Sequence, residues 1–545
     1  MKRFTAYLLI ALWGFAATGC IDNDIPYPVE VLEITALEGE GFTLGPDDID
    51  PAARTVTLRL DERIDLRRVT ITRAAFNHPQ TQTSVPLVGT FDLRTPLYVS
   101  LSLYQRYDWQ IVAEQTVSRS FTVEGQIGAT EWDTENCIAR VYVPEQGFDP
   151  TAVKVTSLKL GPEGCTTMTP SAEELTVFES VRYVDIVYHG DIRERWYLYV
   201  VPTEVTVTLT AADAWSGVIW LYGSGLSGAE MGFRYRRAGE ESWTEVPDVQ
   251  VEGGTFRARL RAVPETTYEV KAYCNEDETA PRSVTTEGVA QLPNAGLEEW
   301  CLLKDIVYPY PADASPFWGS GNPGAAIAGG AVLTDKCTDV RPGSAGRYSA
   351  LLESTYANVA GIGKFAAGNL YTGTYVRNAG TNGIITFGRS FTLRPTALKC
   401  WFKYECGTVD RILSLPAGAQ MEIGGPDNGA IYIALGTWTA EEYGTTEERG
   451  ETIRVGTDDS PICIDTRNKG SFFNPRGKDV VGYGELILDH SVDEWREVTI
   501  PIEYVATDIR PTHVLVVCSA SRYGDYFSGS TKSRMWLDDF ELIYE

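Results

Sequence analysis

The stretch TFRARLRAV, residues 255–263, decides the fold class, because apolar and charged residues alternate along it. The apolar positions include Phe256, Ala258 and Leu260, and an arginine follows each of them. A period of two places the two sets on opposite faces of a β-strand that is buried on one side. The same period recurs in RTVTLRL (54–60), and no segment carries the long apolar stripe of an amphipathic helix. The sequence therefore predicts an all-β protein.

Similar short strand patterns recur along the 545 residues, with Gly, Pro, Asn and Asp between them. This spacing is typical of β-sandwiches. At roughly 150 residues per domain, the length corresponds to three or four domains. Hydrophobic residues make up 43% of the chain, which is enough to fill several separate cores.

Two consecutive segments resemble copies of one module. Each has a strand, a break containing Asp and Arg or Pro, a second strand and a later aromatic-rich strand. The corresponding stretches lie at 53–76 and 107–113 in one copy, and at 136–160 and 195–201 in the other. We expect tandem Ig-like β-sandwiches over residues 30–124 and 125–203. One larger all-β domain is the alternative.

The next unit, residues 204–289, has a more specific motif order. GFRYRRAGEESWTEVP (232–247) precedes the alternating strand quoted above, and Pro264 and Tyr268 follow that strand. This order resembles a fibronectin type III domain. The resemblance implies a third sandwich with a spacer or docking role and without catalytic residues. We expect the three modules together to act mainly as a stalk.

The first twenty residues form a targeting segment. Lys2 and Arg3 precede an apolar run over 4–15, and small residues follow. The segment ends in Ala-Thr-Gly-Cys at 17–20, which resembles a bacterial lipobox. The resemblance implies that Cys20 is acylated and anchors the chain in the membrane. An ordinary cleaved signal with a chance cysteine is the alternative.

Residues 21–29 form a tether after Cys20. Asp22 and Asp24 resemble the acidic tract that directs some Bacteroidetes lipoproteins to the cell surface. We therefore expect an outer-membrane lipoprotein that faces the cell exterior. No later stretch reaches the ~18–20 apolar residues of a membrane span, so acyl chains would be the membrane attachment.

The formal net charge of −27 limits the classes of partner. Nucleic acid binding requires patches of Lys and Arg, so no nucleic acid partner is expected. Nine cysteines remain after Cys20, and the sequence leaves their pairing open.

Residues 290–545 differ in composition, with frequent Gly and Asn between strands. SGNPG, AAGNLYTGTY, FGRSFTLRPTALKCWFKYECG and MWLDDFEL occur there in order. In this order they resemble the "putative carbohydrate metabolism domain" of Bacteroidetes lipoproteins. The resemblance implies a jelly-roll β-sandwich, similar to a carbohydrate-binding module, with a glycan as partner.

The final strand pattern predicts a buried carboxylate. Asp538 shares a face with Phe540 and Leu542, and an unpaired buried carboxylate is costly. A structural calcium ion held by Glu298 and Asp538 would neutralise it. A hydrogen bond or an arginine salt bridge is the alternative.

Aromatic residues on loops are the candidate ligand-binding residues. SPFWGSGNPG (315–324) places Phe317 and Trp318 among turn residues, with Asn322 close by. A sugar ring could stack on Trp318 while Asn322 binds its hydroxyls. Alternatively, the two aromatics close the end of the sandwich. Tyr371 and Trp438 are further candidates beside Gly or turn residues.

No catalytic motif stands out. The four histidines lack zinc-like spacing, and no nucleophile elbow, P-loop or dinucleotide fingerprint is present, so we expect no organic cofactor. A glycoside hydrolase needs only two carboxylates, which the sequence cannot assign, although Asp410 and Glu422 are candidates. We therefore expect a surface lipoprotein that binds glycan. A glycoside hydrolase and an adhesive protein that recognises protein are the alternatives.

Overall fold

The computed structural model describes most of the chain. The described residues are 31–45, 48–51, 53–327, 331–359, 362–416 and 419–545. Cys20 and the lipobox-like segment lie outside these ranges. Within them, no helix is long and apolar enough to cross a membrane. The elements are almost all strands in sandwiched sheets, which confirms the predicted fold class.

The first unit has two sheets, ordered β1-β4-β6 and β2-β3-β8-β7-β5, around a core that contains Trp109. Its strands are β1 (Ile34–Gly39), β2 (Ile49–Asp50), β3 (Thr55–Leu60), β4 (Val69–Phe76), β5 (Gln82–Thr83), β6 (Gly89–Phe91), β7 (Leu97–Ser102) and β8 (Arg106–Gln115). A short 3-10 helix, η1 (Leu66–Arg68), precedes β4.

The second unit has sheets ordered β10-β11-β15-β14-β13 and β12-β9. Its elements are β9 (Ser120–Val123), β10 (Ile127–Asp133), β11 (Ile138–Pro144), β12 (Val155–Lys159), β13 (Thr166–Thr169), η2 (Ala172–Glu174), β14 (Arg182–Tyr188) and β15 (Ile192–Thr203). Phe121 and Val123 on β9 pack in this core. Strand β9 therefore packs with the second unit, although the boundary expected from the sequence placed it in the first.

The first two units share an unusual strand pairing. In the first unit β3 runs parallel to β8, and in the second β11 runs parallel to β15. These are the stretches that correspond between the two halves of the sequence repeat. The shared pairing is what two copies of one module would produce.

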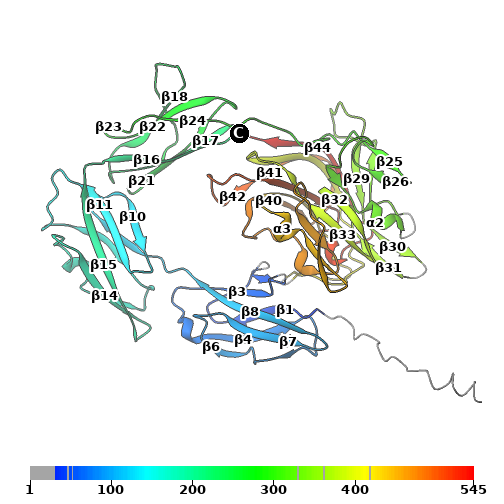
Figure 1. Cartoon of the computed structure of the whole chain (residues 1–545), viewed down its shortest axis with the longest axis horizontal. Coiled ribbons are helices and arrows are strands. Elements are labelled where there is room, and N and C mark those ends of the chain that lie inside the picture. Colours follow the sequence, from blue (N-terminus) through cyan, green and yellow to red (C-terminus); the bar gives the residue numbers. More distant parts are fainter. Residues whose placement is uncertain (1–30, 46–47, 52, 328–330, 360–361, 417–418) are drawn as a thin grey trace, which may run out of the picture.

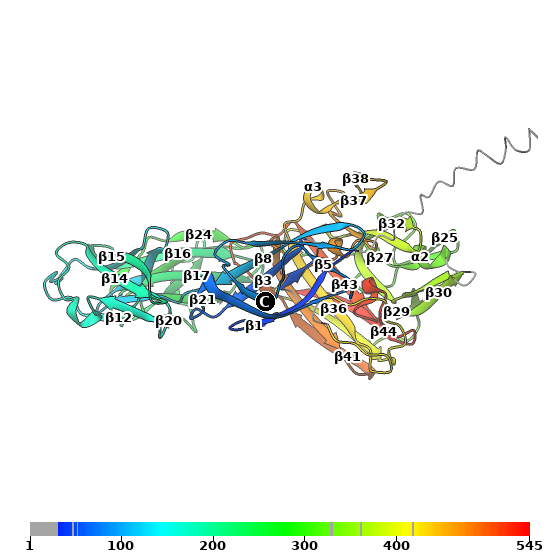
Figure 2. The same ribbon diagram turned by 90° about the horizontal axis from the view of Figure 1, so that it is seen from below.

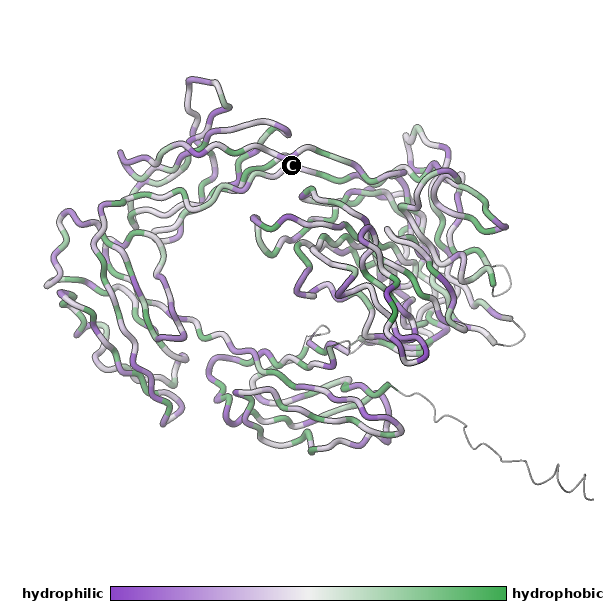
Figure 3. The backbone as a smooth tube through the Cα atoms, in the orientation of Figure 1, coloured by the Kyte–Doolittle hydropathy of each residue, from purple (hydrophilic) through white to green (hydrophobic). Residues whose placement is uncertain are grey.

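The third unit has sheets ordered β16-β17-β21-β20 and β19-β18-β22-β23, and β24 also pairs with β22. Its strands are β16 (Val207–Ala214), β17 (Val218–Gly225), β18 (Met231–Arg237), β19 (Thr244–Glu245), β20 (Gln250–Glu252), β21 (Thr255–Arg261), β22 (Thr267–Cys274), β23 (Asp277–Glu278) and β24 (Arg282–Thr285). On β21 the apolar residues are buried and the arginines exposed, as the alternation predicts. Such alternation of hydrophobic and hydrophilic residues recurs along the strands (Figure 3).

The C-terminal unit is a larger sandwich. A five-stranded sheet, ordered β28-β29-β44-β35-β41, faces a nine-stranded sheet whose main path is β39-β33-β32-β43-β36-β40-β42. The first half of its elements are β25 (Cys301–Leu303), β26 (Ile306–Tyr308), β27 (Trp318–Gly319), α2 (Asn322–Ile327), β28 (Thr334–Cys337), β29 (Ser349–Glu353), β30 (Thr355–Val359), β31 (Ile362–Ala366), β32 (Asn369–Ala379), β33 (Asn382–Phe387) and β34 (Arg389–Ser390).

The second half completes both sheets. These elements are β35 (Ala397–Glu405), β36 (Gly429–Gly436), α3 (Ala440–Tyr443), β37 (Thr445–Glu448), β38 (Glu451–Arg454), β39 (Ile462–Asp465), η3 (Lys469–Ser471), β40 (Val480–Leu488), β41 (Val492–Pro501), β42 (Glu503–Tyr504), β43 (His513–Ser519), η4 (Gly524–Tyr526) and β44 (Arg534–Ile543). Apolar residues from both sheets form the core between them. The nine cysteines of the described residues are free thiols.

The four units follow one another around a closed loop, so that the first unit lies beside the last (Figures 1 and 2). At one junction, Glu287 of the third unit is buried and pairs with Arg394 and Arg510 at 2.7 Å each. At the other, Glu33 of the first unit pairs with Lys469 at 3.4 Å. An extended stalk does not describe this arrangement, because the chain returns to its own C-terminal unit.

Candidate functional site

A pocket of about 720 Å³ lies on the outer face of the nine-stranded sheet. Pockets of ~300–1,000 Å³ are the usual size for small-molecule sites. The pocket lies on the side of the sheet opposite the sandwich core, between loops that follow the strands. Aromatic side chains and charged side chains of both signs line it.

The floor of the pocket is a row of residues across four neighbouring strands. Tyr371 on β32 pairs with Val517 on β43, which pairs with Tyr432 on β36, which in turn pairs with Glu485 on β40. Strands lie about 4.8 Å apart, so the row spans about 14 Å. Alternate residues of these strands face the core, which leaves the row facing the pocket.

Aromatic rings on two loops form walls beside this floor. Phe473 stacks on Tyr432, with ring centroids 5.7 Å apart and an angle of 9° between the ring planes. Phe472 meets Tyr526 edge to face, with centroids 4.9 Å apart. The phenol hydroxyls of Tyr432 and Tyr526 form no hydrogen bond to another described residue. These hydroxyls are therefore available to a ligand.

Two carboxyl groups of different environment line the pocket. Desolvation by the surrounding atoms raises the pKa of Asp525 to about 6, although the side chain keeps an exposed surface. Asp525 is one of the residues that line the pocket, and its carboxyl group has no hydrogen-bond partner among the described residues. Glu485 instead forms an ion pair with Arg522, at 3.1 Å. The two carboxyl groups thus differ, because Asp525 has a raised pKa and no hydrogen-bond partner among the described residues, whereas Glu485 is paired with a guanidinium.

Three cationic side chains line the same pocket. Arg522 pairs with Glu485 and Lys469 pairs with Glu33. Lys364 on β31 has a different environment, because its Nζ donates to Asn382 Oδ1 at 2.8 Å and lies 4.0 Å from the centroid of the Phe527 ring. The pocket therefore offers aromatic faces, carboxyl groups and ammonium groups together.

The first unit supplies part of the rim. Ile49, Asp50 and Pro51 line the pocket although they come more than two hundred residues before the rest of it in the sequence. Close by, Glu33 is 6% exposed, and burial raises its pKa while Lys469 opposes that rise. The pocket is thus a composite of two units that the sequence separates widely.

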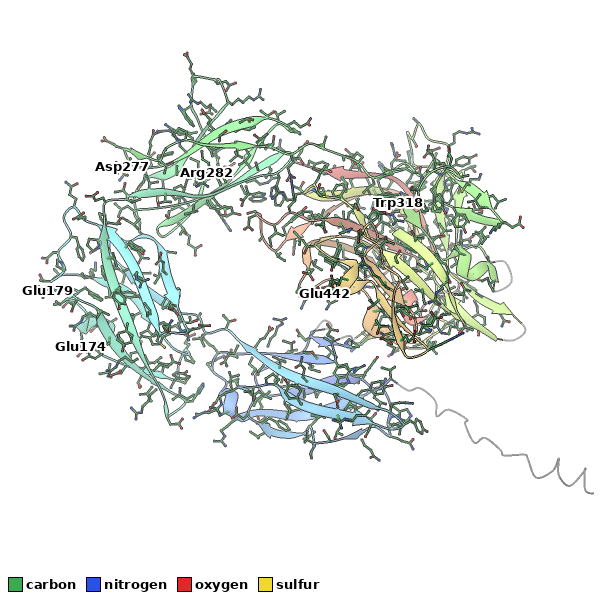
Figure 4. All side chains as sticks on the ribbon, in the orientation of Figure 1. Glu174, Glu179, Asp277, Arg282, Trp318 and Glu442 are labelled. Carbon is green, nitrogen blue, oxygen red and sulfur yellow. The ribbon has the colours of Figure 1, made fainter. Side chains whose placement is uncertain are left out.

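Trp318 lies in the C-terminal unit (Figure 4). Trp318 and Asn322 are both buried, and neither lines the pocket. Trp318 is fully buried, stacks on Phe540 and donates its indole N–H to Pro293 O at 2.8 Å. Asn322 uses its whole amide to bind the backbone of Val307, Leu333 and Thr334.

The sugar-binding role expected of these residues is therefore corrected, because neither Trp318 nor Asn322 has a free surface or a free hydrogen-bonding group. Phe317 packs edge to face on Trp318 and against the core, so it joins the same interior cluster. The alternative of a buried, structural role fits better, because Trp318 lies on β27, pairs with Thr372 of β32 and packs in the core.

The two remaining aromatic candidates lie at the pocket itself or behind it. Tyr371 belongs to the floor, but only 2% of its surface is exposed and its hydroxyl donates to Ser320 O at 3.3 Å. Trp438 is buried and contacts Phe473 edge to face, with centroids 5.9 Å apart. Trp438 therefore supports a wall residue and does not contact the cavity.

Glu298 and Asp538 both accept backbone hydrogen bonds, which are among the alternatives that the sequence analysis gave to calcium. Glu298 accepts the backbone N–H groups of Arg347 and Tyr348. Asp538 is fully buried, as predicted, and its Oδ2 accepts the N–H of Arg341 at 3.0 Å, while its Oδ1 has no partner. No group of three or more His, Cys, Asp or Glu side chains suited to a metal occurs in the described ranges. The calcium hypothesis stays a prediction.

The sequence contains one further signal for the pocket, which lies outside the predicted site residues. SFFNP (471–475) places two phenylalanines among turn residues, in the same manner as the Phe-Trp pair at 317–318. The two pairs are alike in sequence, yet one is interior and the other lines the pocket. The candidate catalytic residues Asp410 and Glu422 do not line this pocket, and Asp410 accepts the N–H of Thr531 at 3.1 Å.

The C-terminal unit matches a known family. The family model described as "Putative carbohydrate metabolism domain" matches residues 294–543, so the pocket lies almost wholly within the matched region. No protein with a curated description matches the chain.

Two similar solved structures are both titled as putative glycoside hydrolases. One, from Bacteroides thetaiotaomicron, is 16% identical, covers 78% of this chain and 96% of its own, and has a TM-score of 0.31. The other, from Bacteroides vulgatus, is 18% identical, covers 46% of this chain and 97% of its own, and has a TM-score of 0.32. These chains are distant in sequence, and their titles describe those proteins alone. The C-terminal unit is therefore a carbohydrate-related domain by its family match.

Proposed function

We propose that the chain binds a glycan in the pocket on the nine-stranded sheet. The observation that carries this proposal is the combination of partly exposed aromatic rings and free polar groups that line one cavity of about 720 Å³. Sugars present apolar C–H faces that pack on aromatic rings, and hydroxyl groups that require hydrogen bonds. Apolar walls with a few placed polar groups are the usual composition of a ligand site.

Specific groups suit each part of a sugar. The rings of Phe473, Phe472 and Tyr526 supply apolar surface, while the hydroxyls of Tyr432 and Tyr526 and the carboxyl group of Asp525 have no protein partner among the described residues. Because these polar groups already line an accessible cavity, a ligand gains their hydrogen bonds without breaking internal ones.

A glycan array tests this proposal. The chain from residue 21 onward, which omits the targeting segment, should bind a restricted set of glycans. If it binds none of a broad panel of plant, microbial and host glycans, or binds all of them equally weakly, the proposal is wrong. Recognition of a protein, the third possibility from the sequence, would then be the next to examine.

Glycoside hydrolysis is the second candidate function, because two carboxyl groups with different environments share the pocket. Glycosidases use one carboxylic acid as a proton donor and a second carboxylate as nucleophile or base. Asp525, with a pKa of about 6, suits the proton donor, and Glu485, paired with Arg522, suits the second role.

Hydrolysis predicts a specific pattern of loss. Asp525→Asn and Glu485→Gln should each lower the rate of sugar release by at least a hundred-fold while the variants still bind the glycan. Activity should also fall as the pH rises through about 6, where Asp525 loses its proton. If the chain binds polysaccharides of a panel but releases sugar from none of them, hydrolysis is excluded and the proposed function is glycan binding alone.

We also propose that the chain is a lipoprotein anchored at Cys20 in the outer membrane and exposed on the cell surface. The lipobox-like Ala-Thr-Gly-Cys at 17–20 supports the anchor, and Asp22 and Asp24 support the surface location. A surface location suits a protein whose ligand is an external glycan.

A further inference from the structure

Lys364 differs from the other cations of the pocket in its lack of a carboxylate partner. The ammonium groups and guanidinium of the pocket belong to Lys364, Lys469 and Arg522. Lys469 pairs with Glu33, and Arg522 pairs with Glu485. Within the described ranges, Lys364 forms no ion pair, and a neutral amide, Asn382, is its hydrogen-bond acceptor.

The hydrogen-bonding capacity of Lys364 is only partly used. An ammonium group has three N–H donors, and Asn382 Oδ1 accepts one of them at 2.8 Å. The Phe527 ring, 4.0 Å from Nζ, covers another side of the group by a cation–π contact. At least one donor therefore remains for a ligand in the cavity that Lys364 lines.

Lys364 is partly removed from water, so its unpaired positive charge is destabilised when no ligand is bound. The side chain is half-buried, and burial lowers the pKa of its ammonium group. The protein as a whole has 74 acidic and 47 basic side chains, so an acidic partner for Lys364 would have been easy to supply. The pocket instead holds a half-buried cation beside a neutral amide and an aromatic ring.

We propose that the pocket binds an anionic sugar, and that Lys364 binds its acidic group. This inference rests on the proposed glycan-binding function and names the class of glycan. A carboxylate of a uronic acid and a sulfate ester are both acceptors of charge-assisted hydrogen bonds. The aromatic walls at Phe472, Phe473 and Tyr526 would pack on the sugar ring that carries the acidic group.

Matched pairs of glycans test the inference. Oligouronates should be compared with the same oligosaccharides after reduction of their carboxyl groups, and sulfated oligosaccharides with their desulfated forms. A hydrogen bond between charged groups is worth about ten- to a hundred-fold in affinity. We expect the acidic member of at least one pair to bind more tightly by that factor, and the preference to shrink as salt is added.

Substitutions then assign the preference to Lys364. Lys364→Gln should abolish the preference for the acidic glycan, and Lys364→Arg should retain most of it. Lys478→Gln is the matched control, because Lys478 is exposed and lies outside the pocket. Thermal melts of each variant would show that the substitutions leave the fold intact.

The outcomes separate this inference from the proposed function. If neutral members bind as tightly as acidic ones, or if Lys364→Gln keeps the preference, the inference is wrong while glycan binding stands. If no glycan of any pair binds while the broad array gives a specific hit, the inference is wrong and glycan binding stands, and if the array also gives no hit, both are wrong. Preference within the uronate pairs or within the sulfate pairs would identify which acidic group the pocket accepts.

Discussion

The carboxyl group of Asp538 lies at a β-bulge in β44, where two residues of β44 oppose one of β35 and Asp539 has a positive φ of 45°. The bulge breaks the alternation of β44, so that Leu537 and Phe540 both pack in the core, and Asp538 between them is fully buried. One of its oxygens has no partner there, and burial raises the pKa of Asp538 to about 6. The folded state therefore binds this proton more tightly than the unfolded state does.

The sign of the resulting pH dependence follows from linkage. Between about pH 4 and pH 6 the folded protein holds more protons at Asp538 than the unfolded chain, so the free energy of unfolding falls as the pH rises. A pKa that is higher by about two in the folded state corresponds to ~3 kcal/mol. Asn cannot lose this proton, so Asp538→Asn should not show this fall in the free energy of unfolding. The difference in stability between the variant and the wild type should therefore shift in favour of the variant as the pH rises from about 4 to about 7. Denaturant melts across that range measure it, and Asp313→Asn, at an exposed position, is the control.

A calcium ion at Glu298 and Asp538 predicts the opposite behaviour. An ion would favour the charged form of Asp538, so a chelator should lower the melting temperature of the wild type, and Asp538→Asn should abolish that response. Melting curves near neutral pH with and without chelator decide between the two. A drop on chelation would support the calcium prediction and contradict the pH dependence given above.

At the scale of elements, strand β40 shows how the pocket floor is positioned. Gly482 and Gly484 face the core, while Tyr483 and Glu485 face the pocket. A Cβ added to Gly484 would lie 2.2 Å from the carbonyl oxygen of Pro501, and the backbone there cannot move away easily. The glycine therefore allows β41 and β42 to pack closely behind the pocket floor.

Gly484→Ala should consequently destabilise the chain by about 1–3 kcal/mol through overpacking, and it should also weaken glycan binding because Glu485 moves with the strand. Chemical denaturation and titration with a glycan that the array identifies measure the two effects. At Gly288 an added Cβ meets nothing closer than 3.5 Å, so Gly288→Ala is the control. If Gly484→Ala is as stable as the wild type, β40 can move away from Pro501 without cost, and the close packing argued here is not required.

The strand patterns explain what the sequence could predict at this scale. Alternation along 255–263 identified a half-buried strand, and the repeat identified the stretches that form the parallel pairs of the first two units. The pocket floor was not predictable, because Tyr432 and Glu485 become neighbours only through the pairing of β36 with β40. Local composition also cannot distinguish an aromatic among turn residues that enters a strand and faces inward, such as Trp318 on β27, from one that lines a pocket, such as Phe473.

At the scale of the whole molecule, the return of the first unit to the C-terminal unit was equally hidden from the sequence. Residues 49–51 line the pocket and Glu33 pairs with Lys469. A chain that begins at residue 119 should therefore bind the glycan more weakly, by several-fold or more, because it lacks the part of the rim that residues 49–51 supply. Titration measures this, with circular dichroism as a check on folding. If the affinity is unchanged, the first unit does not contribute to binding and acts as a spacer.

The anchor is also a property of the whole chain. Cys20→Ala should prevent acylation, so the protein should move from the membrane fraction to the soluble fraction of the cell. Because the proposed surface location depends on this anchor, protease added to intact cells should digest the wild-type protein. Membrane retention of Cys20→Ala would contradict the assignment.

The central claim is that the pocket on the nine-stranded sheet binds glycan, and calorimetric titration of the array-identified glycan against Tyr526→Ala tests it most directly. Tyr526 lines the pocket and its hydroxyl has no partner among the described residues, whereas Tyr98 of the first unit is 69% exposed and lies outside the pocket. We predict that Tyr526→Ala lowers the affinity at least ten-fold and that Tyr98→Ala leaves it unchanged. Equal affinity of Tyr526→Ala and wild type would contradict the claim.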